Sequence, residues 1–174
     1  NTVGDQSVAI GRAALYSNTT GAANIAIGYT ALYNNTIANY NTAVGYQALK
    51  AFNGSNGYNT AVGVNAMLAC TSGGDNTAMG VGALESNTTG TYNTAIGMQA
   101  LDQNTTANYN NAFGGEALKA NTTGTYNTGL GRQALFSNTT ASNNTAVGYQ
   151  AGYSNQTGQY NAFVGYQAGY ANTT

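Results

Sequence analysis

The chain has 174 residues and a net charge of −1, and charged residues make up only 5% of it, against about 25% in a typical soluble domain. Such a chain lacks the basic surface that binds nucleic acid, and no apolar run approaches the roughly 20 residues that span a bilayer. We therefore expect neither nucleic-acid partners nor membrane insertion. The chain does not begin with Met and shows no signal peptide, which indicates a mature or excised segment.

One glycine recurs through the whole chain. Its intervals are 17 residues, with a single interval of 18 between Gly45 and Gly63. The ten positions of this anchor glycine are Gly11, Gly28, Gly45, Gly63, Gly80, Gly97, Gly114, Gly131, Gly148 and Gly165. A fixed short period is typical of a solenoid, and 17 residues are too few for a helical hairpin or a propeller blade. The repeat therefore predicts an all-β fold, a parallel β-solenoid of about ten coils that spans residues 1–174 as one domain.

Each unit contains the same predicted elements in chain order, as residues 93–109 illustrate. Residues 93–96 (NTAI) alternate polar and apolar side chains, which predicts a short strand that ends in a bend at Gly97. Residues 99–103 (QALDQ) predict a second short segment, extended or turned, and residues 104–109 (NTTANY) predict a turn-rich loop. Because Pro is absent, almost every backbone N–H can enter a ladder between coils.

Stacked coils place like residues over like, so the repeat predicts columns of side chains along the rod. Four residues before the anchor glycine, we expect an amide ladder formed by Asn24, Asn41, Asn59, Asn76, Asn93, Asn110, Asn127, Asn144 and Asn161. A Tyr column is expected to stack its rings: Tyr40, Tyr58, Tyr92, Tyr109, Tyr126 and Tyr160. Three residues after the glycine, every unit has an Ala, which indicates room for only a methyl group.

The stretches SVAIG (residues 7–11), NTAIG and NTAVG, each followed by a small residue and Ala, resemble the head repeat of trimeric autotransporter adhesins and related repeats of phage and viral tail fibres. This resemblance covers all ten units through a short motif. It implies a left-handed parallel β-roll, three chains side by side, and an extracellular fibre or adhesive head at a cell or virion surface. The unit here is longer than the family's repeat, and Thr often replaces its first aliphatic strand residue, so we expect a different cross-section.

We expect the rod to associate with copies of itself. Each coil offers about three or four apolar side chains, at roughly 1.5–3 kcal/mol for each large one, whereas ordering its residues costs on the order of 17–34 kcal/mol. A single thin rod is thus marginal, and side-by-side packing through the Ala faces, as in a homotrimer, would stabilise it. No polar cap sequence closes either end, so we expect the chain to be a segment of a longer fibre or to stack head to tail, and we favour a filament in either case.

The loop of each unit also suggests N-glycosylation, because it often contains the acceptor sequence N-x-[ST]. Seven acceptors lie at one fixed phase of the repeat: Asn18, Asn87, Asn104, Asn121, Asn138, Asn155 and Asn172. Three lie slightly out of register: Asn34, Asn53 and Asn143. Two interpretations stay open. A stripe of sugars would solubilise a nearly uncharged rod, or the Asn and Thr residues form only turns and side-chain ladders.

Other columns suggest further functions. Tyr residues one and five positions after the glycine cluster near both ends, where they could bind surface glycans or pack against another chain: Tyr16, Tyr29, Tyr33, Tyr46, Tyr149, Tyr153, Tyr166 and Tyr170. Regular Thr on a flat face would suit ice binding, but the strand Thr column is interrupted and has no second Thr beside it. The stretch GGDN (residues 73–76) occurs once and lacks the several carboxylates of a calcium site.

The sequence contains no catalytic pattern. His is absent, no carboxylate pair recurs, and Cys70 stands where other units have an acceptor Asn, as a small residue without a base. We therefore expect no catalytic residue, no metal site and no cofactor. The sequence predicts a structural subunit of an extracellular fibre or filament. The alternative is an adhesin or tail-fibre head that binds receptors or glycans, and the third interpretation is an ice-binding solenoid.

Overall fold

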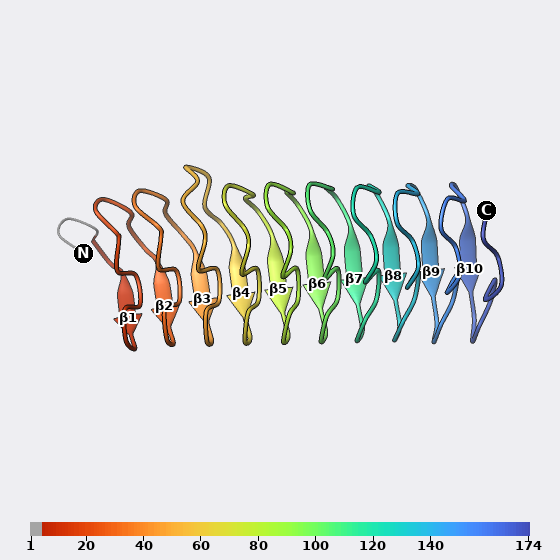
Figure 1. The fold of residues 1–174 in the computed structure, drawn as a ribbon, viewed down its shortest axis with the longest axis horizontal. Coiled ribbons are helices and arrows are strands. Elements are labelled where there is room, and N and C mark those ends of the chain that lie inside the picture. Colours follow the sequence, from red (N-terminus) through yellow and green to blue (C-terminus); the bar gives the residue numbers. More distant parts are fainter. Residues whose placement is uncertain (1–4) are drawn as a thin grey trace.

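The computed structural model describes residues 5–174 and shows an all-β rod of stacked coils whose ends lie at opposite ends of its long axis (Figure 1). Each coil contributes one three-residue strand. The strands are β1 (Val8–Ile10), β2 (Ile25–Ile27), β3 (Thr42–Val44), β4 (Thr60–Val62), β5 (Thr77–Met79), β6 (Thr94–Ile96), β7 (Asn111–Phe113), β8 (Thr128–Leu130), β9 (Thr145–Val147) and β10 (Ala162–Val164). The prediction of a parallel β-solenoid is confirmed.

The ten strands form one parallel sheet in sequence order, from β1 to β10. Equivalent residues pair at every step, as Thr77 with Thr94 and Ala78 with Ala95 illustrate. The 18-residue unit keeps this register, because Thr42 of β3 pairs with Thr60 of β4. Its additional residue is accommodated in the loop between β3 and β4, which rises above the other loops (Figure 1).

The chain turns within each coil because four of its residues adopt a left-handed backbone conformation. In the coil that follows β6, φ is 134° at Gly97, 54° at Gln99, 52° at Leu101 and 58° at Tyr109. Gly97 cannot be replaced, since a Cβ on it would lie 2.6 Å from the carbonyl oxygen of Gly114 in the next coil.

The left-handed non-glycine residues are strained, and hydrogen bonds between coils hold them in place. The N–H of Gln99 donates to the carbonyl of Val81 in the preceding coil at 2.9 Å, and the N–H of Leu101 donates to Ala117 in the following coil at 3.0 Å. The QALxx segment is therefore turned rather than extended.

The core is a narrow column of Ala, Leu and Asn side chains. In the coil around β6 it contains Ala95 at the centre of the strand, and Ala100 and Leu101 beyond the bend, all fully buried. Because side chains of a strand alternate in direction, the residues on either side of Ala95 point outward. The bulky residue before each glycine is therefore on the surface, as Ile96 is.

This arrangement corrects one prediction made from the sequence. The Ala faces cannot pack against a neighbouring chain, because Ala83, Ala100 and Ala117 of the invariant Ala column are fully buried within the coils. Where a Leu follows the invariant Ala, the strand centre has a small residue, such as Ala95, and the bulky residue before the glycine lies outside. In β10 the strand centre is Phe163, whose ring lies against Gly152 and Gly169, the residues that replace this Leu.

Candidate functional site: side-chain ladders and outer faces

The first Asn column, four residues before the anchor glycine, forms a buried ladder from Asn24 to Asn161. Each side-chain oxygen accepts the backbone N–H of the Asn one coil further along, at 2.9–3.2 Å. Most side-chain nitrogens also donate to the backbone carbonyl of the loop residue 14 positions further along the chain, as Asn93 does to Ala107 at 2.8 Å. Within this column, direct amide-to-amide hydrogen bonds join only five successive side chains, those of Asn24, Asn41, Asn59, Asn76 and Asn93.

The second Asn column contains the in-register acceptor sequences and is also buried. The side chains of Asn87, Asn104, Asn121, Asn138 and Asn155 have no exposed surface, and Asn18 is 3% exposed. Each Nδ2 from Asn104 to Asn155 donates to the Oδ1 of the preceding coil at 2.9–3.1 Å. It also donates to the carbonyl three residues further along the chain, as Asn104 does to Ala107 at 3.2 Å.

An N-linked sugar is attached to Nδ2, the atom that this column uses as a donor inside the rod. The geometry therefore favours the ladder interpretation for these six residues. The remaining candidates lie nearer the surface, since Asn34, Asn53 and Asn143 are exposed and Asn172 is partly exposed. Sequence reasoning missed Asn35, which is buried in the same column and donates to Asn18 at 3.0 Å. Its spacing of 17 residues from Asn18 was the available signal.

The second Asn column is interrupted at two successive coils, where Phe52 and Cys70 take the Asn position. Phe52 offers no donor, and the buried Oδ1 of Asn35 has no hydrogen-bond partner within residues 5–174. Cys70 is fully buried and its Sγ donates to the carbonyl of Gly73 at 3.4 Å. Burial raises the pKa of the Cys70 thiol to about 12, so this thiol stays protonated.

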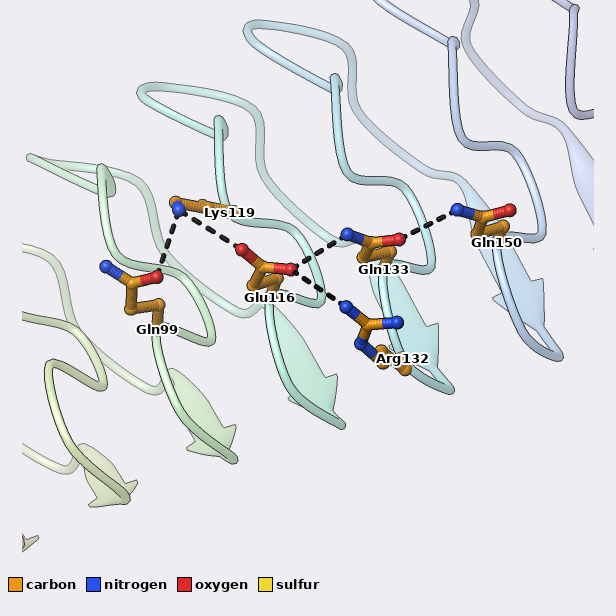
Figure 2. Close-up of polar contacts among 6 residues, drawn as sticks. All are labelled: Gln99, Glu116, Lys119, Arg132, Gln133 and Gln150. Atoms are coloured by element: carbon orange, nitrogen blue, oxygen red, sulfur yellow. Dashed lines mark hydrogen bonds and ion pairs between the residues drawn. The ribbon is translucent and has the colours of Figure 1, made fainter.

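A Gln ladder follows the outer edge of the later coils, two residues after the anchor glycine. Gln167 donates to Gln150 at 2.9 Å. Gln150 donates to Gln133 at 2.8 Å, and Gln133 donates to the Oε2 of Glu116 at 2.8 Å (Figure 2). Every amide thus points its N–H groups toward the Glu116 carboxylate. Sequence reasoning missed this ladder, although Gln recurs at this phase.

Glu116 also forms ion pairs with the two cationic side chains of these coils, Lys119 and Arg132. Figure 2 shows Lys119 between Gln99 and Glu116, with its Nζ 3.0 Å from the Gln99 Oε1 and 3.4 Å from the Glu116 Oε1. Arg132 lies 3.9 Å from the other carboxylate oxygen. The hydrogen bond from Gln133 lowers the pKa of Glu116, and Lys119 and Arg132 lower it further.

Two acidic side chains of equal phase, Glu85 and Asp102, lie in successive coils. Burial raises the pKa of Asp102 and the charge of Glu85 raises it further, whereas Lys119 on the next coil lowers it. In the described part of the chain, His, Cys, Asp and Glu side chains form no group of three that could hold a metal ion.

The aromatic residues form short stacks on the outside of the rod. Tyr92, Tyr109 and Tyr126 stack with ring centroids 5.0–5.1 Å apart and planes within 3° of parallel. Further stacks pair Tyr40 with Tyr58, Tyr16 with Tyr33, Tyr29 with Tyr46, and Tyr149 with Tyr166. In a three-ring stack, Tyr153 lies between Phe136 and Tyr170. Stacked rings cover one another's faces, so only the ends of a stack leave a ring face free. Tyr160 was expected to continue the column of Tyr92, Tyr109 and Tyr126. The preceding coil has Asn143 at this position, and Tyr160 is 79% exposed.

One outer edge of the sheet is mostly apolar along the rod. This apolar stripe consists of the apolar residues immediately before and after each anchor glycine, and the exposed Arg12 and Arg132 interrupt it. Its exposed members are Ile10, Tyr29, Tyr46, Val64, Met79, Val81, Ile96, Met98, Phe113, Leu130, Tyr149, Val164 and Tyr166. The strand Thr residues lie beside the stripe, so a bulky apolar column runs where an ice-binding face would need a second Thr column.

No pocket is found over residues 5–174. The same residues include no helix long and apolar enough to cross a membrane. No protein-family model matches the sequence, and no curated protein or solved structure matches it. The structure confirms the parallel β-solenoid that the adhesin-head resemblance implied, whereas the family itself stays a prediction.

Proposed function

We propose that the chain is a structural segment of an extracellular fibre or filament and acts as a stiff rod rather than as an enzyme. The observation that supports this most strongly is the unbroken register of ten strands. Each step along the axis repeats the same backbone bonds, and most steps add an Asn, Gln or Tyr contact. Stiffness is therefore distributed over the whole length, as a fibre requires.

The rod associates side by side with further copies through its apolar stripe. The exposed members of the stripe present on the order of 1,000 Å² of surface, and each partner in a standard protein interface contributes about 800 Å². An exposed apolar area of this size is rare on a monomer. The resemblance to adhesin heads favours three copies. Strands β1 and β10 are the two edges of the sheet, and head-to-tail pairing of these edges would extend the rod into a filament.

The experiment compares the wild-type chain with Val81→Ser/Met98→Ser, which interrupts the stripe at two exposed residues. Light scattering after size exclusion measures the number of chains, and electron microscopy measures rod length and thickness. We expect wild-type oligomers and loss of association in the double variant. The control, Thr89→Ser/Thr106→Ser, changes two exposed loop residues outside the stripe and should behave as wild type. A monodisperse wild-type monomer at high concentration would refute side-by-side assembly.

The alternative is an adhesive or tail-fibre head that binds receptors or surface glycans. The free ring of Tyr160 favours this alternative, because a sugar needs an uncovered aromatic face and within a stack only the end rings offer one. A glycan array with wild-type chain and Tyr160→Ser tests it. Specific binding that is lost in the variant would support a head, and no binding to any glycan would leave the structural role.

Two further proposals have simple tests. N-glycosylation of the native protein would involve the exposed Asn34, Asn53 and Asn143 rather than the buried column, and a native mass equal to the bare polypeptide would exclude it. Ice binding is the third proposed function, and the strand Thr column supports it only weakly because other residues interrupt it. Absence of thermal hysteresis would exclude it.

A further inference from the structure

The loop of the 18-residue unit contains both Asn–Gly dipeptides of the chain, Asn53–Gly54 and Asn56–Gly57. Both Asn side chains are exposed. By contrast, every Asn of the two ladders is followed by a residue with a β-carbon. The absence of a β-carbon on the following residue matters chemically, because it lets the next backbone nitrogen approach the Asn side-chain carbonyl closely.

Asn53 also has an unusual hydrogen bond. In most coils the Thr hydroxyl of this column donates to a backbone carbonyl one coil further along, as Thr88 does to Thr105 at 3.0 Å. Thr36 instead donates to the side-chain Oδ1 of Asn53 at 2.7 Å. The backbone N–H of Asn53 is held by Thr71 at 3.0 Å, whereas the N–H of Gly54 makes no hydrogen bond within residues 5–174.

We propose that Asn53 is a site of spontaneous deamidation promoted by the Thr36 hydroxyl. Solvent hydroxide removes the proton from the Gly54 backbone nitrogen, which attacks the side-chain Cγ of Asn53. Negative charge then develops on Oδ1, and the Thr36 hydroxyl already points at that atom, as an oxyanion donor does. The Cγ–Nδ2 bond breaks, ammonia leaves with a proton from water, and a cyclic succinimide remains. Water opens this ring to aspartate or isoaspartate.

Asn56 provides an internal comparison within the same loop. It has the same exposed Asn–Gly chemistry, but no hydroxyl donates to its side-chain oxygen among the described residues. Asn53 should therefore react faster than Asn56. The product adds a carboxylate to a rod whose net charge is only −1, at the coils where the second Asn ladder is interrupted by Phe52 and Cys70.

The experiment incubates the purified chain in mildly alkaline buffer and follows both sites by peptide mass mapping, with an isoaspartate-specific methylation assay. The wild-type chain should accumulate aspartate and isoaspartate at Asn53 ahead of Asn56, and the buried Asn104 should remain unchanged. Thr36→Val removes one hydrogen bond to the developing charge and should slow Asn53 about fivefold without slowing Asn56. Thr36→Ser keeps a hydroxyl and should retain most of the wild-type rate.

Several outcomes would overturn the proposal. One is an Asn53 that stays intact while Asn56 reacts. Another is an equal rate at Asn53 in the wild-type chain and Thr36→Val. A native protein with a sugar on Asn53 would also overturn it, because the leaving nitrogen would then be blocked. The far-UV spectrum of each variant checks that the rod is folded, so that a rate change can be assigned to the hydroxyl.

Discussion

Replacement of Asn104 by Ala tests the buried ladder most sharply. The side chain of Asn104 makes three hydrogen bonds: Nδ2 to the Oδ1 of Asn87 at 2.9 Å, Nδ2 to the carbonyl of Ala107 at 3.2 Å, and Oδ1 from the Nδ2 of Asn121 at 3.1 Å. After Asn104→Ala, Ala107 still accepts from Asn93 at 2.8 Å and Asn121 still donates to Gly124 at 2.9 Å. The Oδ1 of Asn87 has no other hydrogen-bond donor among residues 5–174.

The magnitude follows from these partners. An orphaned buried acceptor costs about 1–3 kcal/mol, and each lost bond whose partner keeps another contact costs about 0.5–1.5 kcal/mol. We therefore expect Asn104→Ala to lower the free energy of unfolding by about 3 kcal/mol.

The assay is guanidinium unfolding followed by far-UV circular dichroism, with Thr106→Ala as the matched control. Thr106 lies in the same loop and is exposed, so its truncation should change the midpoint little. If Asn104→Ala unfolds at the same midpoint as Thr106→Ala, the ladder does not stabilise the rod and the reasoning fails.

The remaining predictions concern the core, the Gln ladder and the thiol. Gly129→Ala should stabilise the rod by about 0.5–1 kcal/mol, because equivalent strands have a buried Ala there; the new methyl would lie 3.2 Å from the carbonyl oxygen of Ala134, which must move slightly, and 3.5 Å from Leu118, and a lower melting temperature would show that the backbone does not yield. The lowered pKa of Glu116 contributes stability above its unfolded pKa that is lost as pH falls through the folded pKa. Glu116→Gln should therefore be less stable than wild type at about pH 7 and equal to it well below about pH 4, and a constant difference across this range would be inconsistent. Cys70 should resist a thiol reagent in the folded rod and react fully in denaturant; rapid reaction of the native protein would show that the thiol is accessible.

The repeat predicted the architecture because a solenoid translates sequence period directly into spatial stacking. The spacing of Asn93 and Asn110 placed both in one column, and the structure pairs them through a hydrogen bond of 3.0 Å. The stacking of Tyr92 on Tyr109 follows from the same period. The period fixes which residues lie above one another, and these contacts need no further information.

The period does not fix which way a side chain points. The sequence around Asn104 fits an exposed sugar acceptor and a buried ladder residue equally well, since both have Asn followed two residues later by Thr. Small residue size suggested that Ala100 faces a partner, whereas the coil buries it completely. The left-handed conformation of Leu101 could not be predicted either, because Leu rarely adopts it without hydrogen bonds from neighbouring coils.

Pairwise distances between nitroxide labels on the strand Thr column test most directly whether each unit closes one coil. Labels at positions 60, 77, 94, 128 and 145 should give separations that grow linearly by about 4.8 Å for each coil between them. Double electron–electron resonance on the pairs Thr60/Thr128 and Thr60/Thr145 should therefore report about 19 Å and about 24 Å between the column positions, apart from the reach of the labels. Separations that do not rise with the number of units, or that reach a plateau as in a compact domain, would contradict the stacked rod.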